Sequence, residues 1–224
     1  MIKIKDLMFF IKNILTKIKS CTMMLLTVRK DNTMIMEVHP MKKLNQVVKV
    51  IAKILEIAHW VGAGLMVAVA VCSAAAPQWV GRFMDVEALG QETEVTVYGF
   101  EVAVVDAAGQ FNTTVLCLFA IGAVLIFALV AMMFRNINLI LKKAESATPF
   151  HKDNVRMVRE IGIFSIAIPV IGVIMSTIIR LVVGVDATEA SVRLGGVIMG
   201  VVVLCLSQVF AYGGALERDV DGLV

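Results

Sequence analysis

Four long apolar segments constrain the fold of this 224-residue chain more than any other feature. A helix needs about 20 apolar residues to cross the hydrocarbon core of a membrane, which is about 30 Å thick. It also satisfies its own backbone hydrogen bonds, as lipid surroundings require. The segments are about 55–76, 114–134, 161–183 and 194–212. The sequence therefore predicts an all-α integral membrane protein, a bundle of four transmembrane helices.

Composition and charge agree with this class. Hydrophobic residues make up 59% of the chain and the mean hydropathy is +0.87, whereas soluble globular proteins contain roughly 45–50% apolar residues. The formal net charge is only +3, and the basic residues cluster beside the apolar segments rather than along a groove. We therefore expect the lipid bilayer as the surroundings and no direct contact with nucleic acid.

The positions of Lys and Arg predict the orientation, because basic residues collect on the cytoplasmic side of membrane proteins. Lysines precede the first span, and basic residues fill the connection 135–160 between the second and third spans. The connection 77–113 is acidic instead. We expect 77–113 outside the cell, the loop 135–160 and the tail 213–224 in the cytoplasm, and both termini cytoplasmic.

Residues 1–40 form a basic extension before the single membrane domain predicted for 41–224. Apolar residues recur at helical spacing in the extension, with lysines around them; they are Ile4, Leu7, Ile11, Ile14 and Ile18. One interpretation is an amphipathic helix on an anionic membrane surface. The other is that translation starts at Met41 and the extension has no role in the fold. The sequence leaves both interpretations open.

The acidic connection 77–113 contains a pattern typical of β-strands. Polar and apolar residues alternate over 94–97 and 101–105, around a turn at Tyr98, Gly99 and Phe100. This pattern predicts a small β-hairpin between the first and second helices, on the outer side. Because an isolated hairpin is only marginally stable, we favour a lid packed on the outer ends of the helices. The alternative is a receptor surface for an outside ligand.

Two features inside the spans are candidates for packing or function. Glu56 and His59 lie three residues apart and share a helix face. They form either a proton-relay or substrate site or an interfacial pair beside an anchoring Trp60. Small residues four apart predict helix-packing seams, within one chain or between two: Ala58 and Gly62, Gly64 and Ala68, Gly172 and Ser176, Gly196 and Gly200.

Signatures of catalysis are absent from the sequence. It contains no phosphate-binding glycine loop, zinc-protease motif or nucleophile elbow. The three histidines and four cysteines do not occur at metal-ligand spacing. We expect no catalytic, cofactor-binding or metal-binding residues, and hence a protein that is not an enzyme.

Two cytoplasmic stretches carry more specific patterns. In the loop these are Pro149, Phe150, Asn154, Ile161 and Gly162; in the tail they are Phe210, Tyr212, Gly213, Leu216, Glu217 and Asp221. In these residues the chain resembles the DUF2975 family of bacterial membrane proteins over about residues 41–224. It departs from the pattern at His151, where the family usually has a hydroxyl residue that caps the helix, and at Gly222–Leu223.

The resemblance implies a four-span protein of the bacterial cytoplasmic membrane, without an established activity. Family members are often encoded beside a small helix-turn-helix regulator. This suggests a membrane partner or sensor whose loop and tail residues dock a cytoplasmic DNA-binding regulator. Alternatively, the basic loop and the acidic tail pair with each other. A small transporter, an immunity-type membrane protein, a scaffold subunit of a membrane complex and a homo-oligomer remain open.

Overall fold

The structure is a computed structural model that describes residues 39–78, 80, 94–105, 111–143, 150–184, 188 and 194–221. The chain divides into two units, Met1–Lys43 and Leu44–Val224. In the first unit the described part is the beginning of helix α2 (His39–Ala75). Both interpretations of the N-terminal extension concern residues that lie almost wholly outside the described ones, so they stay predictions.

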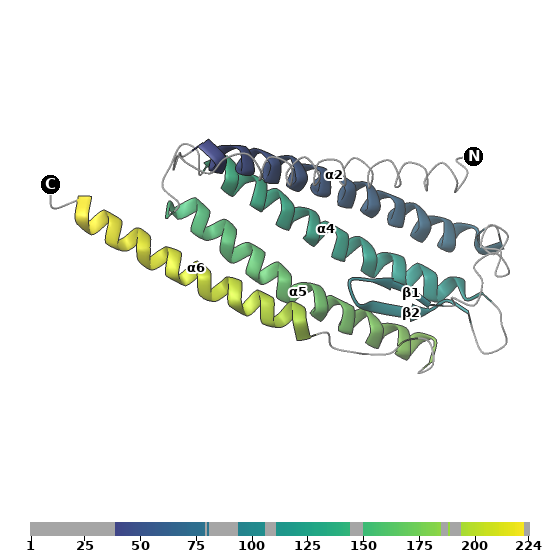
Figure 1. The fold of residues 1–224 in the computed structure, drawn as a ribbon. Helices are drawn as coiled ribbons and strands as arrows, with labels where there is room; N and C mark the ends of the chain where they lie inside the picture. The colour runs from purple at the N-terminus through teal and green to yellow at the C-terminus, as the bar shows by residue number, and fades with distance from the viewer. Residues whose placement is uncertain are drawn as a thin grey trace, which may run out of the picture. The chain divides into compact units, whose positions relative to one another are not determined.

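Four long helices dominate the second unit (Figure 1). After α2 they are α4 (Thr113–Lys143), α5 (Lys152–Val182) and α6 (Leu194–Asp221). Each contains a stretch long and apolar enough to cross a membrane, which confirms the prediction of four such helices. Two of the helices extend beyond the predicted spans. Residues 135–143 continue α4 past its apolar part, and residues 152–160 form the first turns of α5 before its apolar part.

Side-chain contacts join each helix to its neighbour in sequence. The Asn45 side chain of α2 donates a hydrogen bond to the carbonyl of Leu141 at 3.4 Å, and Cys117 lies 3.7 Å from the carbonyl of Ala70. Helix α4 packs on α5, and α5 packs most extensively on α6. Most of the large side chains of α2 and α6 are exposed, whereas α4 is the most buried of the four. The second unit is therefore a row of helices in chain order.

The predicted small-residue seams are used mainly within the chain. An added Cβ at Gly200 would lie 2.8 Å from the carbonyl oxygen of Gly162, and one at Gly62 would lie 3.6 Å from the Phe127 ring. Gly172 receives Phe100 of the hairpin. Gly64 differs, since a Cβ there would meet nothing within 4 Å. Among the glycines of the predicted seams, Gly64 is therefore the one without a packing contact in the described part of the chain.

The hairpin consists of β1 (Glu94–Val97) and β2 (Phe100–Ala103), paired antiparallel. Tyr98 and Gly99 form a two-residue turn with φ of 49° and 87°, as type I′ turns require. The predicted hairpin is confirmed, but its second strand begins one residue earlier and ends at Ala103 rather than Val105. The reason is that the turn uses two residues instead of three.

The apolar face of the hairpin is buried against α4 and α5. Phe100 is only 2% exposed, and its ring stacks on Phe119 with centroids 5.1 Å apart. The Tyr98 ring at the tip reaches Phe127, with centroids 6.4 Å apart. Phe127 lies about 21 Å along α4 from its first residue. The hairpin does pack on the helices, as the lid interpretation predicted, but it was wrong to place it at their outer ends. It runs deep along the helices because its apolar face is buried there.

Candidate functional site

The first candidate site lies where the hairpin tip meets α2. Nδ1 of His59 lies 2.7 Å from the carbonyl oxygen of Leu55, which can only accept, so Nδ1 donates this hydrogen bond. Nε2 lies 2.5 Å from the Tyr98 hydroxyl oxygen and accepts from it in that tautomer. The rings of Phe127 and Phe134 lie 5.8 and 5.4 Å from the imidazole. The site is thus an imidazole–phenol hydrogen bond inside an aromatic cluster.

Glu56, which the sequence pairs with His59, has a different partner. Glu56 is 8% exposed, and its carboxylate forms a salt bridge of 3.1 Å with Lys53. The structure brings His59 to Tyr98 instead, a residue that sequence reasoning did not single out as a site residue. The predicted turn could have indicated a role for Tyr98, since it placed this residue at the tip of a hairpin that needs to pack against the helices to be stable.

We expect Tyr98→Phe to lower the free energy of unfolding by about 1 kcal/mol, the usual net worth of one hydrogen bond. The ring and its aromatic contacts remain, so only the bond to His59 is lost. Unfolding in detergent, followed by circular dichroism, measures the change. The matched control is Tyr212→Phe, because Tyr212 is 70% exposed. Equal effects of the two substitutions would show that the His59 bond contributes nothing.

The second candidate site joins the loop and the tail. Phe150 precedes α5, and its ring meets Phe210 of α6 edge-on with centroids 5.8 Å apart. An added Cβ at Gly213 would lie 2.9 Å from the Phe150 ring, and one at Gly214 would lie 2.7 Å from the Phe150 carbonyl oxygen. Two glycines therefore form the notch that seats Phe150. The sequence pointed to Gly213 but missed Gly214.

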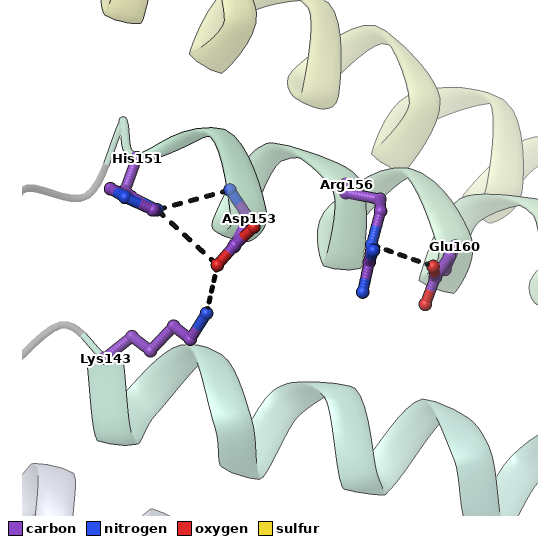
Figure 2. A network of polar contacts seen from close by, with 5 residues as sticks. All are labelled: Lys143, His151, Asp153, Arg156 and Glu160. Carbon is purple, nitrogen blue, oxygen red and sulfur yellow. Dashed lines mark hydrogen bonds and ion pairs between the residues drawn. The ribbon is translucent and has the colours of Figure 1, made fainter.

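Polar contacts between α4 and α5 hold the start of α5 beside this notch (Figure 2). The His151 imidazole accepts a hydrogen bond of 3.3 Å from the backbone N–H of Asp153, so the side chain of His151 caps the start of α5. Lys143, from the last turn of α4, forms a salt bridge with Asp153. The hydrogen bond from Lys143 lowers the pKa of the Asp153 carboxyl group. Asp153 precedes the apolar part of α5.

A second set of contacts lies two turns further along α5. Asn136 of α4 donates a hydrogen bond of 2.9 Å to Glu160. Arg156 lies 3.4 Å from the same carboxylate (Figure 2). Together with Lys143 and Asp153, these residues define where α4 and α5 face each other. Asn154 is buried at the same end of the helices. The loop side chains thus serve first to set the register of α5.

The other residues of the predicted docking site differ in exposure, and some of them lie outside the described part. Tyr212 is 70% and Leu216 50% exposed, and Glu217 is half-buried. Gly162 lies at the closest approach of α5 and α6, facing Leu204. Pro149 and the side chain of Asp221 lie outside the described residues. The predicted docking residues therefore divide into a group that contacts itself and a group that is accessible.

Comparison with known families matches most of the chain to one of them. The family model of DUF2975, described as a protein of unknown function, matches residues 73–224. The chain belongs to the DUF2975 family. No curated protein and no solved structure has significant similarity to it.

The DUF2975 match begins in the last turn of α2, later than the residue 41 expected from the sequence. All the loop and tail residues described above lie inside the matched range. Within the described chain, the DUF2975 part comprises the hairpin, α4, α5 and α6. Glu56 and His59 precede it, so the hydrogen bond at the hairpin tip joins the DUF2975 part to the rest of α2.

Proposed function

We propose that this DUF2975 protein is a non-enzymatic multi-pass protein of the bacterial cytoplasmic membrane, which docks a cytoplasmic DNA-binding regulator on the last turns of α6. In this proposal the four helices cross the membrane, and the hairpin enters the helix bundle from the outer side and runs along α4 to Phe127. The end of α4, the start of α5 and the end of α6 face the cytoplasm. The basic residues at 135–159 support this orientation, because such residues favour the cytoplasmic side.

One observation carries the docking proposal, an exposed apolar stripe on α6. Its members are Val209, Tyr212, Leu216 and Val220, all exposed. Their spacing of three or four residues places them on one helix face. Large apolar side chains grouped on an accessible surface are typical of protein interaction sites, and an amphipathic helix commonly binds a partner through such a stripe.

The position of the stripe distinguishes it from the lipid-facing parts of the same helix. Gly213 and Gly214 lie level with Phe150, which precedes the first residue of α5. The turns of α6 after Gly214 therefore extend past the start of α5, as Figure 1 shows. At that level the neighbouring helices carry Lys143 and Lys152, which belong in an aqueous or headgroup environment. Leu216 and Val220, the stripe residues after Gly214, therefore have no lipid to cover them.

The Phe150 notch supports the proposal by giving the stripe a fixed base. Phe150, Phe210 and Gly213 hold α6 against α5, whereas Tyr212 and Leu216 project away. The helix-turn-helix genes often found beside family members support a DNA-binding regulator as the partner. The hairpin supports a sensor role, since it runs along the helices and contacts α4, α5 and His59 of α2.

The test starts from affinity purification of the tagged chain in mild detergent, with mass spectrometry to identify a co-purifying helix-turn-helix protein. The dissociation constant of that purified protein is then measured for two variants. We expect Tyr212→Ser/Leu216→Ser to weaken binding on the order of 10-fold or more, since buried aromatic anchors dominate interface energies. The matched control is Met199→Ser/Val202→Ser, an equally exposed apolar pair earlier in α6. Unchanged binding by the first variant, or equal losses in both, would exclude the stripe as the docking site.

A further inference from the structure

A basic face lies on one side of the α4–α5 pair. Four exposed cations occupy it: Arg135 and Lys142 from α4, and Lys152 and Arg159 from α5. Each immediately precedes a residue that bridges the two helices: Asn136, Lys143, Asp153 and Glu160. These contacts fix the direction in which each bridging residue projects from its helix, and therefore also the direction of the residue before it. The placement of the four cations therefore follows from contacts that the structure shows.

Helix geometry places all four cations on the same side. One residue back along a helix corresponds to a rotation of about 100°. Because α4 and α5 are antiparallel, a step of one residue back rotates clockwise in one helix and anticlockwise in the other when both are viewed from the same end. Starting from residues that point at each other, opposite rotations bring the preceding residues to a common side. Arg135 and Arg159 project together, as do Lys142 and Lys152.

The nearby acids do not neutralise this face. Asp153 is paired with Lys143, and Glu160 is bonded to Asn136 and Arg156. Among the described residues, none of the four cations has an ion-pair partner. The face thus carries accessible guanidinium and ammonium groups that are available to an external anion.

The two arginines mark the boundary of the apolar segments. Arg135 follows Phe134 directly, at the end of the apolar part of α4, and Arg159 is two residues before Ile161, where the apolar part of α5 begins. If the helices cross the membrane as proposed, both guanidinium groups lie at headgroup depth on the cytoplasmic side. Lys142 and Lys152 lie two turns further out, about 10 Å along the helices.

We propose that Arg135 and Arg159 form a binding site for the phosphate of an anionic membrane lipid. A guanidinium group binds a phosphate through two parallel hydrogen bonds, and basic sites between membrane helices on the cytoplasmic side suit anionic headgroups. The lysine pair adds attraction at longer range but lies too far from the bilayer to hold the same phosphate. This inference rests on the proposed membrane location of the protein.

The test uses the full chain in nanodiscs of phosphatidylcholine with a minor fraction of phosphatidylglycerol, and native mass spectrometry of the lipid retained after release. We expect the wild-type chain to retain phosphatidylglycerol in excess over its share of the bilayer. Arg135→Gln/Arg159→Gln should lower its apparent affinity for this lipid on the order of 10-fold. The matched control, Lys142→Gln/Lys152→Gln, removes the same charge from the same face and should lower it only about 2-fold.

Three outcomes overturn the proposal. Equal losses in the two variants would indicate general attraction of cations to an anionic surface. A wild-type chain without excess phosphatidylglycerol would show that no lipid site exists. Displacement of the lipid by inorganic phosphate at equal concentration would show a site for free phosphate. Failure of the chain to enter nanodiscs at all would instead contradict the membrane location, so the two proposals fail in different ways.

Discussion

Replacing Phe100 with alanine is expected to lower the free energy of unfolding by about 3 to 5 kcal/mol, the usual cost of removing a buried aromatic side chain. Phe100 is almost completely buried and stacks on Phe119. It also lies against Gly122 and Gly172, which have no side chains of their own to fill this space. Its removal would leave a cavity between α4, α5 and the hairpin. Equilibrium unfolding in mixed detergent micelles measures the effect.

The matched control for Phe100→Ala is Thr96→Ala in the other strand. Thr96 is exposed and belongs to the opposite face of the hairpin, paired with Glu101. Substitutions at such positions usually change stability by less than about 0.5 kcal/mol. If Phe100→Ala costs no more than Thr96→Ala, the hairpin does not depend on the helices, and its deep position along α4 is incorrect.

Replacing Gly200 with valine is expected to separate α6 from α5 and to cost at least about 2 kcal/mol, at the upper end of overpacking effects. A Cβ at Gly200 would lie 2.8 Å from the carbonyl oxygen of Gly162 and 3.2 Å from the backbone nitrogen of Ile166. Backbone atoms of a helix cannot move aside as a side chain can. The whole of α6 must therefore shift, which would also withdraw Gly213 from Phe150.

The matched control is Gly195→Val in the same helix, since an added Cβ at Gly195 meets nothing within 4 Å. Both substitutions add the same side chain to the same helix, and a difference larger than the helix-propensity change of about 1 kcal/mol reports the contact with α5. Tryptophan placed at Phe150 offers a second measurement, because its fluorescence should shift when the notch opens. Equal stability of the two valine variants would contradict the close approach of α5 and α6.

The sequence was sufficient for the helices and for the existence of the hairpin. Apolar runs of membrane length and the alternating pattern around Gly99 are local signals, and the structure confirms both. The helix ends were less predictable, because the polar residues at 135–143 form helix equally well. The turn was predicted one residue too long, since a two-residue type I′ turn and a three-residue turn share the same glycine.

The depth of the hairpin and the site contacts were beyond sequence reasoning. The burial of Phe100 depends on glycines in two helices that are far away in sequence, Gly122 and Gly172. Likewise, the bond between His59 and Tyr98 joins residues 39 positions apart. Helical spacing suggested Glu56 as the companion of His59, but Lys53 occupies that carboxylate. Local periodicity shows which residues share a face and not what the face meets.

The packing of each helix on its neighbour in sequence has a consequence for biogenesis. Chains are made from the N-terminus, and segments associate as their partners emerge. In this protein α4 finds α2 already made, α5 then finds α4, and α6 arrives last on α5. The hairpin is the exception, because it is synthesised before both helices that bury it. Its apolar face is covered only in part, by α4, until α5 has been translated. The interval between the synthesis of α4 and that of α5 is therefore the vulnerable stage of assembly.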